Sequence, residues 1–160
     1  MTAGMNDRTA WPDLSGRLIR DGNGRRAHVL PLRVYFEDTD FSGIVYHATY
    51  LRWCERGRSD FMRLLGNDHQ ALLEGQAGVP AAFVVRRMSL EYKRPARIDE
   101  MLTVTTCLNE MSAAVLKLDQ IVARDDQILF EALVEIVLVS LDGKPQRLTQ
   151  RLRDCFAPTV

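Results

Sequence analysis

The feature that most constrains the fold is a change of hydrophobic period near residue 80. Before it, apolar residues recur at spacings of three and four, at Tyr50, Trp53, Cys54, Gly57, Phe61, Leu64 and Leu65. This spacing predicts one long amphipathic helix, with Thr49 as its N-cap and Gly66 as its end. After it, apolar and polar residues alternate with a period of two, the pattern of strands, over residues 84–92, 102–108, 115–122 and 128–140.

The four predicted strands follow one another through short links, and short links join antiparallel neighbours. Asp125-Asp126 and Asp142-Gly143 supply turn chemistry in this part of the chain. The chain is therefore α+β and not a doubly wound α/β protein. One helix with a single apolar face, set against such a sheet, predicts a hotdog fold. In that fold an antiparallel sheet of about five strands wraps around one long central helix.

A single domain is expected to run from residue 29 to residue 155. Its first strand is predicted over residues 29–36, and a short second helix over residues 68–74. Residues 1–28 have scattered Gly, Arg and Asp and no apolar stretch, so we expect a mostly disordered extension there. The last strand is apolar on both faces toward its end, which implies that a partner subunit covers the second face of the sheet.

Composition excludes several classes of protein. The 160 residues carry 21 basic and 21 acidic side chains, so the net charge gives no general attraction to nucleic acid or to an anionic membrane. The three cysteines, Cys54, Cys107 and Cys155, have no C-x-x-C spacing, so we expect neither a disulfide framework nor a structural metal site. No apolar run is long enough to span a membrane, and we expect a cytoplasmic protein.

The acidic segment Asp38-Thr39-Asp40 has three interpretations. The first is an Asx turn or a helix cap, in which a side-chain oxygen accepts backbone N–H bonds. The second is phosphoryl transfer of the haloacid-dehalogenase type, which the four antiparallel strands argue against because that fold needs a parallel sheet. The third is attack on a thioester by Asp40, with the oxyanion held by the helix that starts near residues 47–50. The spacing permits this geometry without proving it.

Two blocks of sequence carry more information than the acidic segment alone. The first block is Arg33-Val34-Tyr35-Phe36-Glu37-Asp38-Thr39-Asp40, then Gly43-Ile44-Val45-Tyr46-His47-Ala48, Tyr50, Trp53, Glu55-Arg56 and Arg58. The second block is Phe83-Val84-Val85-Arg86-Arg87-Met88-Ser89-Leu90-Glu91-Tyr92-Lys93-Arg94-Pro95-Ala96-Arg97. In these blocks, over roughly residues 32–149, the chain resembles the 4-hydroxybenzoyl-CoA thioesterase-like hotdog family. Within that family it resembles the YbgC-type branch, which is associated with the Tol-Pal system of Gram-negative bacteria.

The resemblance implies roles for individual residues. Asp40 matches the catalytic aspartate of the family, either a nucleophile or a general base. His47 matches a histidine of the branch at the start of the central helix. The backbone N–H of His47 would point at the thioester carbonyl. Its imidazole would polarise that carbonyl or protonate the leaving thiolate. Substrate binding is expected from the loop residues between them, Gly43, Ile44, Val45 and Tyr46. Phe36 departs from the branch, in which a tyrosine is common.

For the other charged residues and histidines, the sequence predicts structural roles or binding of the coenzyme A tail. Asp38 is expected to bond loop N–H groups or an arginine. Glu55 is either a second catalytic carboxylate or, as we favour, the partner of Arg58 or Arg86 in an ion pair. His28 and His69 are expected at the surface. Cationic groups for a coenzyme A tail would come from among Arg86, Arg87, Lys93, Arg94, Arg97 and Lys117.

The function favoured by the sequence is hydrolysis of acyl-CoA to free acid and coenzyme A, with no metal and no organic cofactor. The alternative of a different class is a binding module that holds acyl carrier protein or an envelope-assembly partner without turnover. A hotdog dehydratase fits the Asp40 loop less well. The expected partners are acyl-CoA and a second copy of the chain, in a tetramer in preference to a dimer.

Overall fold

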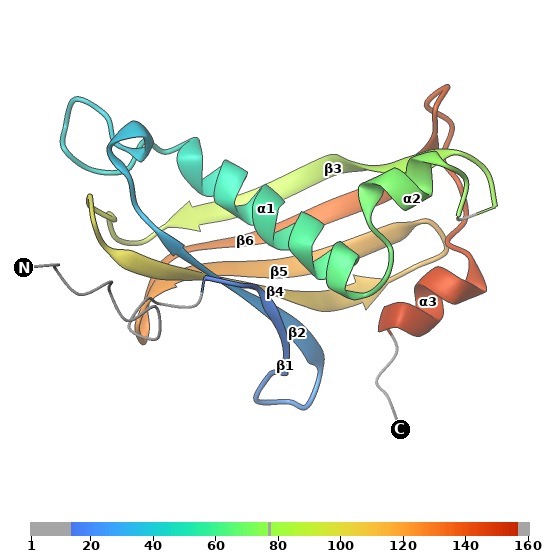
Figure 1. The fold of residues 1–160 in the computed structure, drawn as a ribbon, viewed down its shortest axis with the longest axis horizontal. Helices are drawn as coiled ribbons and strands as arrows, with labels where there is room; N and C mark the ends of the chain where they lie inside the picture. The colour runs from blue at the N-terminus through green and yellow to red at the C-terminus, as the bar shows by residue number, and fades with distance from the viewer. Residues whose placement is uncertain (1–13, 77, 157–160) are drawn as a thin grey trace, which may run out of the picture.

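The computed structural model describes residues 14–76 and 78–156 of the chain. Six strands form one antiparallel sheet in the order β1-β2-β4-β5-β6-β3, and α1 lies across one face of it (Figure 1). The strands are β1 (Arg17–Arg20), β2 (Arg26–Arg33), β3 (Ala81–Tyr92), β4 (Met101–Met111), β5 (Val115–Arg124) and β6 (Gln127–Ser140). The helices are α1 (Thr49–Leu64), α2 (His69–Leu73) and α3 (Gln150–Phe156). The predicted α+β class is confirmed, with six strands in place of about five.

The two faces of the sheet have different environments because successive side chains of a strand point to opposite sides. On the α1 side, Val104, Leu118 and Val134 are fully or almost fully buried. Their neighbours along the strands, such as Thr105 and Leu133, are only partly buried. The core therefore lies between α1 and one face of the sheet. The second face is half apolar and stays partly open to solvent in the single chain.

Helix α1 buries the predicted stripe, including Tyr50, Trp53 and Phe61. It ends as predicted, because Leu65 is the C-cap and Gly66 follows with a φ of 79°, a conformation that glycine adopts without strain. Its start differs from the prediction. Ala48 is the N-cap and makes no side-chain capping bond, and Thr49 is already helical.

Gly57 lets α1 approach the sheet closely. A glycine within the apolar stripe predicts close approach to another backbone. A Cβ added there would lie 3.0 Å from a methyl carbon of Val104 and 3.1 Å from Oγ1 of Thr106. The close contacts are thus with side chains of β4 and not with another backbone. The lack of a side chain at Gly57 leaves room for a polar contact between the helix and the sheet.

That contact is made by Gln120, a fully buried residue of β5. Its Nε2 donates to the carbonyl oxygen of Cys54 and to Oγ1 of Thr106, both at 2.8 Å. Its Oε1 accepts a hydrogen bond from the guanidinium of Arg58 at 2.7 Å. Buried polar groups of this kind stabilise a structure only while all partners are in place. Gln120 therefore joins α1 to β4 and β5 at one point.

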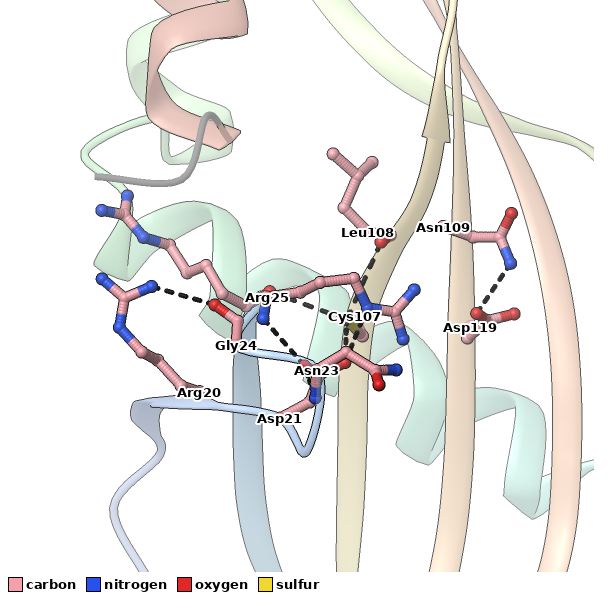
Figure 2. Close-up of polar contacts among 10 residues, drawn as sticks. Arg20, Asp21, Asn23, Gly24, Arg25, Cys107, Leu108, Asn109 and Asp119 are labelled. Atoms are coloured by element: carbon pink, nitrogen blue, oxygen red, sulfur yellow. Dashed lines mark hydrogen bonds and ion pairs between the residues drawn. The ribbon is translucent and has the colours of Figure 1, made fainter. Parts of the chain in front are cut away.

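The first part of the ordered chain differs from its prediction. Strand β1 lies within residues 1–28, for which a disordered extension was expected, while residues 1–13 lie outside the described part of the chain. The strand predicted over residues 29–36 is β2, which both begins and ends three residues earlier. In the turn between β1 and β2, Asp21 accepts hydrogen bonds from the backbone N–H groups of Asn23 and Arg25 (Figure 2).

His28 was predicted at the surface, and this prediction is wrong. Its side chain is fully buried on the α1 side of β2, where Nε2 lies 2.7 Å from Oδ2 of Asp60. Burial lowers the pKa of His28 although Asp60 acts in the opposite direction. A histidine in a strand is a polar residue, which predicts exposure. The Asp60 carboxylate that pairs with it lies on α1, 32 positions away, so the sequence does not reveal the pair. His69 is exposed, as predicted.

Replacement of Gln120 by leucine should destabilise the fold strongly. Leucine keeps the approximate volume but leaves Arg58 and Thr106 without their partner, so we expect the free energy of unfolding to fall by about 3 kcal/mol. Urea denaturation followed by circular dichroism measures this change. Gln70→Leu, at an exposed position of α2, is the control and should change the stability by less than about 0.5 kcal/mol. Equal stability of the two variants would contradict the role given to Gln120.

Candidate active site

The segment between β2 and α1 forms a small hairpin at the end of the sheet where β3 also ends (Figure 1). Thr39 and Val45 form an isolated antiparallel bridge. In the loop between these two residues, the N–H of Asp40 donates to the carbonyl of Ile44, and the N–H of Gly43 donates to the carbonyl of Asp40, both at 3.0 Å. Gly43 has a φ of 79°, which a side chain would strain. The Asp-x-x-Gly spacing therefore closes a turn that presents Asp40.

Asp38 supports this hairpin by bonding a backbone N–H group, one of its two predicted roles. One carboxylate oxygen, Oδ2, accepts the N–H of Tyr35 at 2.8 Å, and the backbone carbonyl of Asp38 accepts the N–H of Tyr46 at 2.9 Å. The carboxylate of Asp38 makes no bond to an arginine within the described residues. The two aspartates of the Asp-x-Asp segment thus have different roles. The carboxylate of Asp38 bonds the backbone of the chain that enters the hairpin, and the carboxylate of Asp40 is exposed to solvent.

The carboxylate of Asp40 is exposed and ionised at neutral pH. Its Oδ1 accepts the N–H of Ser42 at 2.8 Å and also the hydroxyl of Ser42. These two bonds hold the pKa of Asp40 below its ordinary value, and the nearby charge of His47 acts in the same direction. Oδ2 of Asp40 has no hydrogen-bond partner in the described part of the chain. An ionised, oriented carboxylate with one free oxygen is suited to act as a base or a nucleophile.

His47 stands two residues before α1. Its ring lies 4.5 Å from the ring of Tyr46 and 6.4 Å from that of Tyr92, measured between centroids. The backbone N–H groups of His47 and Ala48 donate to no acceptor among the described residues, as is common at the start of a helix. Unpaired N–H groups at the positive end of a helix dipole stabilise a developing negative charge.

A cavity of about 320 Å³ opens at this helix start. Of the residues predicted for the site, the structure brings Ile44, Val45 and His47 into its lining, whereas Asp40, Gly43 and Tyr46 are on the adjoining hairpin. Sequence reasoning missed Tyr50 and Tyr92 as lining residues. The hydrophobic pattern counts Tyr50 as an apolar position of a helix and Tyr92 as an apolar position of a strand. Their hydroxyl groups were the feature that could have indicated a polar role. The cavity is completed by the run Lys93-Arg94-Pro95.

A larger cavity, of about 530 Å³, lies on the opposite face of the sheet. The β1–β2 turn reaches over it, where the thiol of Cys107 lies 3.6 Å from Oδ2 of Asp21 (Figure 2). Burial raises the pKa of Cys107 to about 11, so the thiol is protonated and a poor nucleophile. None of the predicted site residues lines this cavity, and we therefore place the candidate site at the start of α1.

Glu55 lies away from the candidate site. Its Oε1 accepts the hydroxyl of Ser59 at 2.6 Å, and the same hydroxyl lies 2.8 Å from Nε2 of His69. The ion pair predicted with Arg58 or Arg86 is not formed, because the guanidinium of Arg58 donates to Gln120 instead. Glu55 therefore connects α1 to the start of α2.

Within residues 14–76 and 78–156, no three His, Cys, Asp or Glu side chains come together in an arrangement that would hold a metal ion. Over the same residues, no helix is both long and apolar enough to cross a membrane.

Comparison with known proteins gives concordant matches. A family model described as the thioesterase-like superfamily matches residues 34–155. The acyl-CoA thioesterase YbgC of Haemophilus influenzae is 37% identical over 127 residues, which cover 79% of this chain and 91% of that protein. The acyl-CoA thioester hydrolase YbgC of Escherichia coli O6:H1 is 41% identical over 124 residues, covering 76% and 90%.

Solved structures show the same similarity. The structure of a protein described as a probable thioesterase from Bartonella henselae has a TM-score of 0.75 at 43% identity and covers 77% of this chain and 99% of that one. A mutant 4-hydroxybenzoyl-CoA thioesterase, complexed with 4-hydroxybenzoyl-CoA, has the same TM-score at 17% identity, covering 82% and 99%. This last similarity concerns the fold alone.

Removal of the Ser42 hydroxyl should raise the pKa of Asp40. The side-chain bond from Ser42 is the largest of the effects that lower this pKa, so Ser42→Ala moves the titration of the carboxyl group toward higher pH. A carboxyl-detected NMR titration of the isotope-labelled protein measures the shift. Ser112→Ala, in the turn between β4 and β5, is the control and should leave the Asp40 titration unchanged. An unchanged titration in Ser42→Ala would show that the hydroxyl does not set the charge of Asp40.

Proposed function

This chain belongs to the thioesterase-like superfamily and is a thioester hydrolase, and we propose that it cleaves acyl-CoA with Asp40 and the start of α1. The predicted hotdog family is confirmed by the matched family model. The predicted YbgC-type branch is confirmed by the relatives at 37% and 41% identity. The proposal concerns the residues that carry the reaction and the way in which they act.

The single observation that carries the proposal is the state of Asp40. Its carboxylate is ionised and exposed, is oriented by Ser42 through one oxygen, and has no partner for the other oxygen among the described residues. The residue lies seven positions before His47, whose N–H at the helix start also has no acceptor in that part of the chain. A thioester carbonyl between these two groups would meet a nucleophilic or basic oxygen on one side and oxyanion donors on the other.

Two routes are compatible with this arrangement. As a general base, Asp40 takes a proton from water while the water oxygen bonds to the carbonyl carbon. As a nucleophile, Asp40 bonds to that carbon itself and forms an anhydride, which water then hydrolyses. In both routes the oxyanion lies at the N–H of His47. The C–S bond breaks when the tetrahedral intermediate collapses, to the free acid in the first route and to the anhydride in the second. The coenzyme A thiolate receives a proton from His47 or, in the general-base route only, from the protonated carboxyl of Asp40.

The lining of the cavity supports acyl-CoA as substrate. Ile44, Val45 and the rings of Tyr50 and Tyr92 provide an apolar wall of the kind that an acyl group needs. Lys93 and Arg94 line the same cavity and are basic, as groups that meet the phosphates of coenzyme A must be. Of these two, Lys93 already pairs with Glu91 and Glu131. Gly43, Ile44, Val45 and Tyr46 all stay predictions as substrate-binding residues. Acyl carrier protein as a partner, the Tol-Pal association and a cytoplasmic location also stay predictions.

We also propose a homo-oligomer, with a tetramer favoured. β3 is twelve residues long and, among residues 14–76 and 78–156, pairs with β6 alone, so its other edge has backbone groups that no described strand pairs. On the sheet face away from α1, Ile121 and Leu133 are only partly buried. Pairing along β3 and packing of the two open faces would each remove apolar surface from water.

Sedimentation equilibrium tests the assembly. We expect a mass near four times the 18.2 kDa of one chain, and a reduction to two chains in Leu133→Glu, because a charge on the open face opposes packing of two sheets. Lys144→Glu, in the exposed turn after β6, is the control and should not change the mass. A monomer in the wild-type protein would contradict the proposal.

Substitution of Asp40 tests the reaction. Asp40→Ala and Asp40→Asn should lower kcat for acyl-CoA hydrolysis at least ~100-fold, the low end for loss of an acid–base group. A thiol-release assay over short-chain, long-chain and aromatic acyl-CoAs measures it. Asp142→Asn is a matched control, because this aspartate also accepts a serine hydroxyl in a turn, after β6. Its activity should equal that of the wild type.

Three outcomes have different meanings. Full turnover by a folded Asp40→Ala protein would remove Asp40 from the mechanism. Wild-type protein that binds acyl-CoA but hydrolyses none of the thioesters would favour the binding module for acyl carrier protein or an envelope-assembly partner. Label in Asp40 after a single turnover in ¹⁸O-labelled water would establish the nucleophilic route, with water attacking the anhydride at the aspartyl carbonyl.

A further inference from the structure

Two tyrosines join the end of β3 to the candidate site. The hydroxyl of Tyr92, the last residue of β3, donates to the backbone carbonyl of His47 at 2.8 Å. The hydroxyl of Tyr50 accepts the N–H of Ala96 at 3.0 Å, and the carbonyl of Ala96 accepts the N–H of Val45 at 2.9 Å. Tyr92 thus acts on His47 directly, whereas Tyr50 reaches the hairpin only through Ala96.

The Tyr92 bond fixes the peptide unit that follows His47. The peptide unit before His47 is held by the backbone alone, because the carbonyl of Tyr46 accepts the N–H of Thr49 at 2.9 Å. Peptide units are planar, so only the two soft dihedral angles of His47 lie between them. When both planes are held, the directions of the N–H groups of His47 and Ala48 and of the Cα–Cβ bond of His47 are set. Among the described residues, the hydroxyl of Tyr92 is the side-chain group that hydrogen-bonds to these two peptide units.

The hydroxyl of Tyr92 is itself well positioned. Its ring centroid lies 5.1 Å from that of Phe130, a fully buried residue of β6, and 5.6 Å from that of Tyr50. Aromatic side chains packed in this way keep few rotamers. Tyr92 is 43% exposed, and the packed side of its ring restricts where the donor lies. The bond to His47 transfers that restraint to the site.

We propose that Tyr92 is a positioning residue for thioester hydrolysis, which holds the peptide unit between His47 and Ala48 so that the N–H of Ala48 keeps its direction beside that of His47, where the oxyanion forms. The inference rests on the proposed function and adds to it a group on β3 that touches neither the thioester nor Asp40. Oxyanion donors are effective because they are oriented before the reaction and need no rearrangement during it. Loss of the Tyr92 bond would let the His47 peptide rotate, and the cost would appear in the chemical step.

The protonation of Tyr92 is constant over the working pH range. Desolvation raises the pKa of its hydroxyl above the ordinary value of 10, so the group is a neutral donor. Tyr92→Phe should therefore lower activity by the same factor at every pH. A group that exchanged protons with the substrate would instead change the shape of the pH profile.

The test compares three variants in steady-state hydrolysis of one acyl-CoA. Tyr92→Phe keeps the ring and removes the hydroxyl. We expect kcat to fall about tenfold and KM to change less than about twofold, since a hydrogen bond of ordinary strength that matters only in the transition state affects kcat. Tyr50→Phe leaves the N–H of Ala96 unpaired next to a buried side chain, so it should lower the melting temperature more than Tyr92→Phe but kcat less. Tyr35→Phe removes an exposed hydroxyl without a bond in the described chain and is the control.

The outcomes separate this inference from the proposed function. If Asp40→Ala is inactive while Tyr92→Phe retains kcat within about twofold of the wild type, only the role of Tyr92 is wrong. If the loss in Tyr92→Phe is confined to KM, the residue binds substrate and does not position His47. If kcat follows the melting temperature, so that Tyr50→Phe loses more activity, the effect is structural and the inference fails. If Asp40→Ala is fully active, the proposed function itself fails.

Discussion

The burial of one stripe of α1 against one face of the sheet is the constraint on which the other features depend. Trp53, Phe61 and the β-strand residues that they cover leave water together, and the hydrophobic effect makes this the dominant stabilising contribution. Gly57 allows the helix to come close, and Gln120 determines where along the strands it lies, through bonds to Cys54, Thr106 and Arg58. Because the helix is placed in this way, its first turn has a defined position at one end of the sheet.

The candidate site follows from that position. The chain must pass from β2 to the helix start, and it does so through a hairpin whose turn presents Asp40. The same end of the sheet contains the last residue of β3, from which Tyr92 reaches the carbonyl of His47. The site therefore combines an exposed loop with the ends of a helix and a strand. Its carboxylate comes from the loop, and the groups that would hold the oxyanion are tied to the helix and the strand.

Much of this could be predicted from the sequence, for physical reasons. The helix stripe and the strand alternation reflect burial on one side, so they predicted α1, β3, β4, β5 and β6. Pairings between distant residues leave no such pattern. The burial of His28 depends on Asp60, and the role of Tyr92 depends on a backbone carbonyl 45 positions away. Strand β1 was missed because four residues rich in arginine have no apolar period, and its order depends on distant residues, through pairing with β2 and contact with α1.

Strand β1 also affects how the sheet can extend. It precedes the residues that the family model matches, and it pairs with Arg26–Val29 at the edge opposite β3. Its ends are Arg17 and Arg20, and the uncovered half of β2 contains Pro31, which has no N–H to offer. One edge of the described sheet is therefore short and charged, which disfavours further strands, while the other is long. Two such sheets that join through their long edges present only the short, charged edges afterwards, which opposes continued addition into a fibre.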